Sequence, residues 1–221
     1  MVKESGPVNF IDDVIQKFPF SQEAVIAIDP VGRRETHHFS HLFARSLGLS
    51  GAMLEQGVRR GDVVMILTGS RIEFVISMLA CFRMGAIALP LNPQLTAADL
   101  AFRVSATNPS LAIGESRYLE NLGSGVPALD MDDLARIFDE DLDQATPAKT
   151  AKLDPGDPAL IVFTSGSTGE PKGVIHPQSY LLGQSTQAEP VSYTHLRAHE
   201  TPEHLVCRLL LEKNNRLHNR T

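Results

Sequence analysis

The sequence lacks the features that mark secreted and disulfide-stabilised proteins. It has two cysteines in 221 residues, Cys81 and Cys207, too few for a disulfide framework and without the spacing of a metal site. The amino-terminal segment MVKESGPVNFIDDVIQKF has neither the cationic start nor the continuous apolar stretch of a secretory signal, and it is too acidic for a typical transit peptide. We therefore expect a cytoplasmic protein.

Long apolar runs and a basic surface are also missing. The most apolar segment, Phe74–Phe82, is bounded by Glu73 and Arg83 and is too short to cross a bilayer. We expect no transmembrane segment but a buried helix there, with Cys81 as a buried thiol. The net charge of −6 argues against nucleic acid as a partner, because phosphates attract basic surfaces. What remains is the composition of an ordinary globular domain, with 43% hydrophobic and 21% charged residues.

Strand-like and helical segments alternate along the chain. This pattern predicts an α/β fold with a largely parallel sheet and flanking helices. Expected strands cover residues 24–29, 62–67, 86–91, 110–114, 159–163 and 173–175. Expected helices cover residues 10–18, 41–56, 70–84 and 96–107, and Gly57 and Gly85 follow two of them as left-handed caps. Ser70 with Glu73, and Thr96 with Asp99, have the spacing of capping boxes.

Two other segments favour structural interpretations. Residues 120–157 are rich in Gly, Asp, Pro and Ala, and we interpret them as a surface connection with one short helix rather than as a functional acidic cluster. The tripeptide Arg60–Gly61–Asp62 occurs in cell-adhesion ligands. Here it lies between a helix cap and an expected buried strand, so we interpret it as a turn.

The segment TSGSTGEPKG, residues 164–173, carries the clearest chemical signal. Gly166 and Gly169 allow backbone amides to converge on an anion, four hydroxyl side chains add donors, and Lys172 adds a positive charge. Apolar β-rich runs flank the segment on both sides, which is unusual for a flexible linker. The pattern favours a phosphate-binding loop.

Known phosphate-binding motifs do not fit this segment. A Walker-type P-loop places its lysine directly after the second of two glycines, and here Lys172 comes later than that. The dinucleotide-binding motif opens a helix, whereas Pro171 and a strand-like run follow here. The residues alone therefore leave the type of phosphate site open.

TSGSTGEPKG is similar to the signature loop of the adenylate-forming superfamily, which includes acyl-CoA synthetases, peptide-synthetase adenylation domains and firefly-type luciferases. GVRRGDVVMIL, CFRMGAIALPLNPQLTAADLAFRV and SLAI also resemble that superfamily's amino-terminal region. The resemblance covers roughly residues 9–189, which we expect to form a truncated amino-terminal AMP-binding domain.

The resemblance implies a ligase that uses ATP, Mg²⁺ and coenzyme A to activate a small-molecule carboxylic acid. A carboxylate attacks the α-phosphorus of ATP to give an acyl-adenylate and pyrophosphate, and a thiol then displaces AMP. The expected ATP-phosphate residues are Thr164, Ser165, Gly166, Ser167, Thr168, Gly169 and Lys172. His176 is a candidate for the acyl pocket, with a structural role as the alternative, and the Glu170 carboxylate should face away from the triphosphate.

Within the superfamily, MGAIALPLNPQLTAADLAFRV and GVIHPQSYLLGQ look most like the branch of acetyl- and medium-chain acyl-CoA synthetases. An adenylation domain that loads a carrier protein is one alternative. A non-catalytic nucleotide-binding or interaction protein is another. Neither a catalytic residue nor a metal ligand is assigned, because the family's catalytic lysine lies in a later domain.

Residues 190–221 do not resemble the family's continuation. Leu205, Leu209 and Leu210 recur at helical spacing, which permits an amphipathic helix. However, 190–201 and 205–213 can both be encoded by DNA that resembles a transposase-type sequencing adapter, with a gap the length of a library index between them. We therefore expect this tail to be translated adapter and the chain itself not to turn over substrate.

Overall fold

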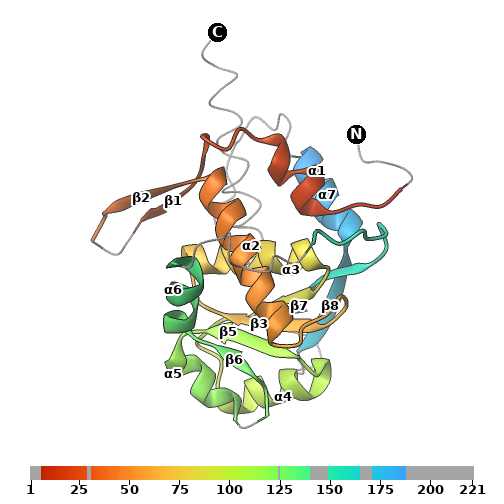
Figure 1. Cartoon of the computed structure of the whole chain (residues 1–221). Coiled ribbons are helices and arrows are strands. Elements are labelled where there is room, and N and C mark those ends of the chain that lie inside the picture. Colours follow the sequence, from red (N-terminus) through yellow and green to blue (C-terminus); the bar gives the residue numbers. More distant parts are fainter. Residues whose placement is uncertain (1–5, 29–30, 124, 140–148, 165–170, 188–221) are drawn as a thin grey trace.

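The computed structural model describes residues 6–28, 31–123, 125–139, 149–164 and 171–187. These residues form a six-stranded sheet with helices on both faces and a separate two-stranded hairpin (Figure 1). The strands are β1 (Glu23–Ile28), β2 (Arg34–His38), β3 (Val63–Leu67), β4 (Ile87–Pro90), β5 (Leu111–Gly114), β6 (Ala128–Leu129), β7 (Pro158–Thr164) and β8 (Lys172–Pro177). The α-helices are α1 (Phe10–Asp13), α2 (Phe39–Glu55), α3 (Ile72–Met84), α4 (Ala97–Thr107), α5 (Ser116–Leu119), α6 (Met131–Asp139) and α7 (Gln178–Gln187), with 3₁₀ turns η1 (Ile15–Lys17) and η2 (Glu120–Leu122).

The sheet has the strand order β6-β5-β3-β4-β7-β8. All neighbours pair in parallel except β7 and β8, which are antiparallel, so the predicted α/β fold with a largely parallel sheet is confirmed. The chain moves from β3 to β4 on one side and then returns past β3 to β5 on the other. Because crossover connections are right-handed, these two moves place α3 and α4 on opposite faces of the sheet.

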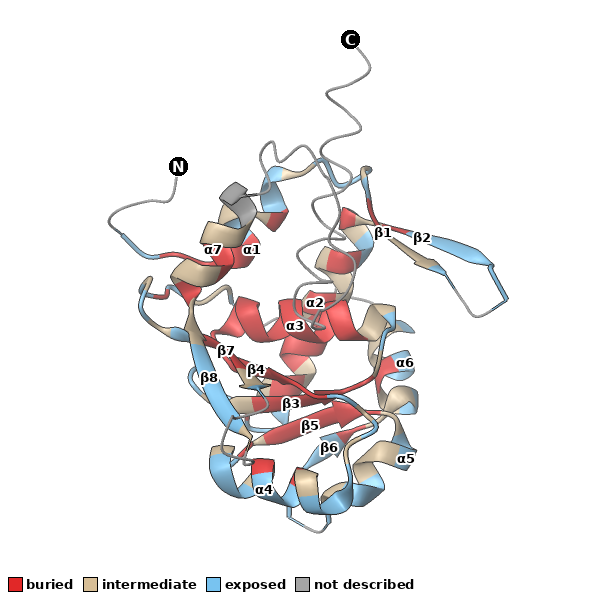
Figure 2. Ribbon diagram, turned by 180° about the vertical axis from the view of Figure 1, so that it is seen from behind, coloured by how far each residue is buried: buried red, intermediate tan, exposed pale blue. Residues whose placement is uncertain are grey.

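Side chains of β3 alternate between two hydrophobic clusters. Val64 and Ile66 belong to the cluster that includes residues of α2, α3 and α6. Met65 and Leu67 belong to the second cluster, which includes residues of α4 and α5. Figure 2 shows the central strands buried, with helices above and below them. A strand buried on both faces needs apolar residues at every position, which explains why VVMIL lacks a polar alternation.

Helix α3 confirms the predicted buried helix. Every residue from Phe74 to Met84 is buried, and Gly85 ends the helix with φ of 73°. A Cβ atom at Gly85 would lie 2.7 Å from Leu153 Cδ2, so both the backbone and the packing require glycine. Cys81 is fully buried, and burial raises the pKa of its thiol to about 12.

The expected capping box at the start of α3 is wrong. The N-cap is Arg71, not Ser70, and its side chain makes no capping hydrogen bond. The backbone N–H of Arg71 donates to Gly69 O at 3.0 Å, and this turn delays the helix by one residue. Glu73 is then too close to the cap to complete a box.

Other helix boundaries match the sequence more closely. The capping box of α4 is confirmed, with Thr96 Oγ1 accepting from the Asp99 N–H and the Asp99 carboxylate accepting from the Thr96 N–H. Helix α2 begins slightly before its expected start and is followed by Gly57 with φ of 90°. The expected helix over 10–18 is interrupted at Val14, where the backbone leaves helical geometry, and becomes α1 and η1.

The segment between η2 and β7 contains more structure than expected. The short strand β6 extends the sheet, and Asp130 caps α6 by accepting hydrogen bonds from the backbone N–H groups of Asp132 and Asp133. The Asp133 N–H is the largest cause of the lowered pKa of Asp130. Residues 140–148, which include the end of the acidic stretch 130–143, lie outside the described residues. The Asp130 carboxylate therefore has a structural role as the amino-terminal cap of α6.

The Arg60–Gly61–Asp62 tripeptide forms the turn that we predicted. Gly61 has φ of 86°, and Arg60 Nη2 lies 2.6 Å from Asp157 Oδ2, which ties this turn to the segment that enters β7. The β1–β2 hairpin projects away from the sheet (Figure 1), and β2 was not expected because its sequence RETHH is polar. Among the described helices, none combines the length and apolarity needed to cross a bilayer.

Candidate functional site

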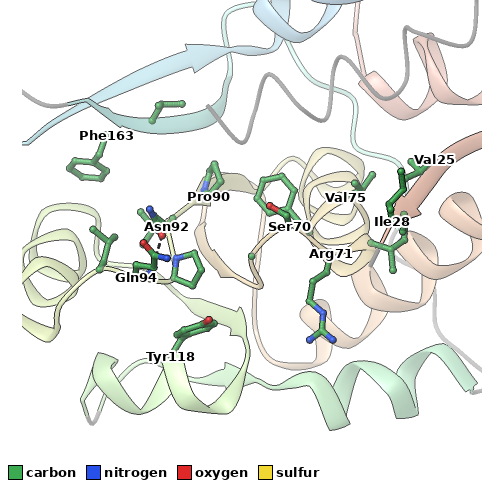
Figure 3. Close-up of a pocket in the computed structure, with 18 of the residues that line it drawn as sticks. Val25, Ile28, Ser70, Arg71, Val75, Pro90, Asn92, Gln94, Tyr118 and Phe163 are labelled. Carbon is green, nitrogen blue, oxygen red and sulfur yellow. Dashed lines mark hydrogen bonds between the residues drawn. The ribbon is translucent and has the colours of Figure 1, made fainter. Parts of the chain in front are cut away.

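A cavity of about 710 Å³ lies at the carboxyl ends of β3, β4 and β7. Its walls come from the segments that follow β3 and β4, from β1, and from Val162 and Phe163 at the end of β7. Phe163 lies at one end of the cavity and Val25 and Ile28 at the other (Figure 3). Ligands of open α/β sheets bind at this edge, because the loops leaving parallel strands diverge there. The cavity is therefore the candidate site.

Local turns shape the wall that follows β4. Leu91 N donates to Ile66 O at 2.9 Å, which keeps the chain beside β3, and Pro93, which has no N–H group, follows the end of the strand. Asn92 Oδ1 accepts a hydrogen bond from Gln94 N at 2.9 Å, an Asx turn that reverses the chain (Figure 3). Thus, the motif LNPQ forms one rim of the cavity.

The charged side chains that line the cavity are paired with carboxylates. Among the described residues that line it, the charged ones are Arg71 and Arg103. Arg71 is half-exposed and lies 3.5 Å from Glu115 and 3.9 Å from Glu73. Arg103 is buried, and its Nη1 donates to Asp99 O at 2.7 Å and lies 3.8 Å from Asp99 Oδ1. The cavity is therefore mainly apolar, and carboxylates lie beside both of its arginines.

Two of the predicted phosphate residues lie beside this cavity. Thr164 is the last residue of β7, next to the lining residue Phe163, and Lys172 is the first residue of β8. The antiparallel register pairs Thr164 with Lys172, and both are exposed. The structure thus brings together the two ends of the predicted loop. The other predicted residues, Ser165, Gly166, Ser167, Thr168 and Gly169, lie outside the described residues, as does Glu170.

His176 lies farther along β8. It is half-buried, pairs with Leu160 across the hairpin, and has its ring 4.3 Å from that of Tyr180 on α7. It is not one of the residues that line the described cavity. Its assignment to an acyl pocket stays a prediction.

Sequence reasoning missed most of the cavity, including Arg103 and Phe163. The wall is assembled from segments far apart in the chain, and no single motif marks them. A signal did exist for Arg103, because it stands on the same helix face as Leu100 and Val104, both of which pack into the core. A charged residue on an apolar helix face is uncommon unless it is paired. The described residues contain no group of three or more metal-ligating side chains.

Comparisons with known proteins agree with the sequence and the fold. The family model for AMP-binding enzymes matches residues 11–209. The chain is 35% identical over 179 residues to 4-chlorobenzoate–CoA ligase from Arthrobacter sp, covering 75% of this chain and 33% of that protein. It is 30% identical over 149 residues to the probable non-canonical nonribosomal peptide synthetase CymA of Salinispora arenicola (strain CNS-205), covering 66% of this chain and 2% of that protein. The chain thus spans a third or less of these curated relatives.

Solved structures share the fold. The structure of VinN matches with a TM-score of 0.76 and 22% identity, covering 94% of this chain and 57% of VinN. ATP-bound MatB from Rhodopseudomonas palustris matches with a TM-score of 0.63 and 23% identity, covering 81% of this chain and 37% of that protein. At this level of identity the likeness concerns the arrangement of strands and helices.

Proposed function

Because this chain belongs to the family of AMP-binding, adenylate-forming enzymes, we propose that it binds ATP at the β7–β8 hairpin as part of an acid–thiol ligase. The single observation that carries the proposal is the pairing of Thr164 with Lys172 beside the cavity. This pair anchors both ends of a segment whose residues are almost all small or hydroxylated. Such a segment can direct amides, hydroxyls and one ammonium group at a triphosphate.

The proposed reaction has two steps. A carboxylate oxygen of the substrate attacks the α-phosphorus of ATP, the bond from that phosphorus to the bridging oxygen breaks, and pyrophosphate leaves. The sulfur of a thiol then attacks the acyl carbon, AMP leaves, and the thiol proton passes to solvent or to a base. Adenylyl transfer depends mainly on positioning and on neutralising charge, so hydroxyls, amides and Lys172 suffice for the role that we propose for this segment.

We propose separate roles for the individual side chains. Thr164, Ser165, Ser167 and Thr168 would donate hydroxyl hydrogen bonds to phosphate oxygens, and Gly166 and Gly169 would let the amides approach closely. Lys172 would offset the charge on the β- and γ-phosphates. His176 would border the acid's acyl group, with a purely structural role as the alternative.

Magnesium and coenzyme A are proposed as partners of the reaction, and neither is assigned to a site in the described residues. These residues hold no cluster of carboxylates for a protein-bound cation, and the charged side chains that line the cavity are arginines. Among the described residues, the cavity lining thus offers no carboxylate ligand for Mg²⁺. A magnesium ion would instead arrive bound to the phosphates of ATP.

The acceptor and the acid are narrower proposals. The likeness to 4-chlorobenzoate–CoA ligase supports coenzyme A as the thiol, and we keep acetyl- and medium-chain acids as the substrate class, with fatty acid metabolism in the cytoplasm as the setting. The likeness to CymA supports the alternative of an adenylation domain that loads a carrier protein. Recovery of the gene downstream of this reading frame tests the choice, since a carrier domain there would favour the alternative.

Titration calorimetry of the 221-residue chain with MgATP tests the proposed site. We expect measurable binding that Lys172→Ala weakens by about tenfold or more, because a charge-assisted contact to phosphate is lost. Lys152→Ala removes the same charge from another exposed position and should leave the affinity unchanged. The proposal is contradicted if the wild-type chain binds no ATP. It is also contradicted if Lys172→Ala and Lys152→Ala weaken ATP binding equally. The alternative of a non-catalytic nucleotide-binding protein predicts that the complete protein binds ATP tightly but releases no pyrophosphate.

We propose further that residues 9–189 correspond to the family's amino-terminal domain and that residues 190–221 are translated adapter. The family match, which ends at residue 209, crosses this boundary and does not define it. Resequencing of the source locus tests the boundary, because an intact tail in genomic DNA would refute the adapter origin. A pyrophosphate-release assay on the 221-residue chain tests the accompanying expectation that it does not turn over.

A further inference from the structure

Phe163 connects the predicted nucleotide loop to the rest of the fold. It immediately precedes Thr164, is half-buried, and pairs with Gly173 across the hairpin. A Cβ atom at Gly173 would lie 3.3 Å from Phe163 Cζ, so the ring already lies against the backbone of β8. The ring therefore packs on the residue pair that lies next to Thr164 and Lys172 in the ladder.

Two successive residues of α4 contact the same ring. The guanidinium carbon of Arg103 lies 5.0 Å from the centroid of Phe163, and the ring of Phe102 meets it edge-on at 6.2 Å and 73°. A cation over an aromatic face is held more strongly when it is desolvated, and Arg103 is only 7% exposed. The contact thus joins α4 to the last part of β7.

Arg103 is firmly held by its own helix but incompletely hydrogen-bonded. Its Nη1 donates to Asp99 O, and Asp99 belongs to the capping box that begins α4. Its Nε is buried and has no hydrogen-bond partner among the described residues. An unpaired buried donor is costly, and an unbranched apolar side chain would fill the position without that cost. The ion pair with Asp99 Oδ1, at 3.8 Å, involves a partly exposed carboxylate and contributes little, so stacking on Phe163 is the contact that best explains an arginine here.

We infer that Arg103 is a positioning residue for nucleotide binding, and this inference rests on the function proposed above. The guanidinium plane fixes the Phe163 ring, the ring fixes the end of β7 against Gly173, and the Thr164–Lys172 pair is held at the cavity that Arg103 and Phe163 line. Arg103 acts through Phe163 and does not contact the nucleotide. Holding the donors in place before the ligand arrives removes part of the ordering cost of binding.

A double-mutant cycle on MgATP affinity tests this inference in the 221-residue chain. Arg103→Met and Phe163→Leu should each raise the Kd about three- to tenfold, the range expected from the loss of one cation–π contact. The double variant should be no worse than the worse single variant, because both changes break one link. Arg103→Lys should not restore affinity, since lysine keeps the charge but lacks the planar group. Arg45→Met is the matched control, because Arg45 also lies over an aromatic ring, that of Phe138 at 5.2 Å, and neither residue lines the cavity.

The outcomes separate this inference from the proposed function. If the wild type does not bind ATP, or if Lys172→Ala binds as well as the wild type, the proposed function fails and the inference fails with it. If Lys172→Ala weakens binding but Arg103→Met stays within about twofold of the wild type, only the inference is overturned. It is also overturned if Arg103→Lys restores affinity or if the two single losses add. Circular dichroism confirms folding, and if Arg103→Met does not fold, Arg103→Lys and Phe163→Leu carry the test.

Discussion

Thr164 and Lys172 lie directly opposite each other in the antiparallel ladder of β7 and β8. Side chains of directly paired residues are neighbours on one face of a sheet, so the hydroxyl and the ammonium group start from adjacent positions. The segment between them leaves and re-enters the sheet at one point, beside Phe163 and the cavity. An anion there would meet groups from both strands, which a linker between unpaired strands would not provide.

Gly85→Ala should destabilise the chain by about 2–4 kcal/mol, more than the backbone strain alone. Gly85 has φ of 73°, and the added Cβ would lie 2.7 Å from Leu153 Cδ2. Gly57→Ala is the matched control, because Gly57 also follows a helix with a positive φ of 90° but has no atom within 4 Å of the added Cβ. Urea unfolding of both variants measures the difference. Equal losses would show that the contact with Leu153 contributes nothing.

Asn9→Ala should cost about 2–3 kcal/mol, because it leaves buried carbonyl groups without a donor. The Asn9 amide donates to Phe82 O at 3.0 Å, to Arg83 O at 3.2 Å and to Ala151 O at 3.0 Å, and Asn9 is 3% exposed. Gln16→Ala removes an exposed amide and should change stability by less than about 0.5 kcal/mol.

Asn9→Asp gives a sharper test of the same contacts. A carboxylate would face the carbonyl oxygens that now accept from the amide, and this repulsion together with burial would raise the pKa of the new carboxyl group. The variant should therefore be less stable than Asn9→Ala at neutral pH and should recover stability as pH falls and the carboxyl group is protonated. A pH-independent difference between the two variants would contradict this account of Asn9.

Cys81 should resist alkylation in the folded chain. It is fully buried, and burial raises the pKa of its thiol from 9.0 to about 12, so the reactive thiolate is scarce. In a Cys207→Ser background, labelling of native protein should be at least about a thousandfold slower than labelling in urea, because reaction requires opening of the core. Rapid labelling under native conditions would show that α3 is not packed as described.

The same burial predicts a loss of stability in alkali. The neutral thiol is favoured in the folded state, so its contribution is fully present below the ordinary pKa of 9.0 and is lost as pH rises toward about 12. Cys81→Ala removes this contribution, and its stability should fall less steeply with pH over that range. Parallel pH profiles for the two proteins would refute the prediction.

The order of strands and helices could be predicted from the sequence because each buried element carries its own signal. In α3 and β3 almost every residue is apolar, and Gly85 and the Thr96–Asp99 box mark boundaries that backbone geometry enforces. The signal fails where tertiary contacts decide the structure. Among the described strands, the polar β2 pairs only with β1. The start of α3 depends on a backbone turn at Gly69 that competes with the Ser70–Glu73 spacing.

The candidate site was only partly predictable. The loop composition indicated phosphate binding, and the expected flanking strands proved to pair so that Thr164 faces Lys172. The cavity, in contrast, depends on the strand order, which brings the ends of β3, β4 and β7 together although they are distant in sequence. The contact of Arg103 with Phe163 likewise spans α4 and β7. Periodicity within one segment carries no information about such partners.

The capping box of α4 predicts an acid-sensitive contribution to stability. Hydrogen bonds from the Thr96 hydroxyl, at 2.6 Å, and from the Thr96 N–H, at 3.2 Å, lower the pKa of Asp99 from its ordinary value of 3.8. Because the folded state favours the carboxylate, this stability is present above pH 3.8 and is lost as pH falls through the lower, folded-state pKa.

Asp99→Asn should therefore be less stable than the wild type at neutral pH, and the difference in urea midpoint should shrink as pH falls below 3.8. Asp139→Asn is the matched control, because it removes the same charge from an exposed position at the end of α6, where a negative charge is unfavourable. That variant should show no loss at neutral pH. If the urea midpoint of Asp99→Asn instead differed from that of the wild type by a constant amount at every pH, the carboxylate would not contribute through its charge. Helix α4 would then hold Arg103 against Phe163 without help from an ionised cap.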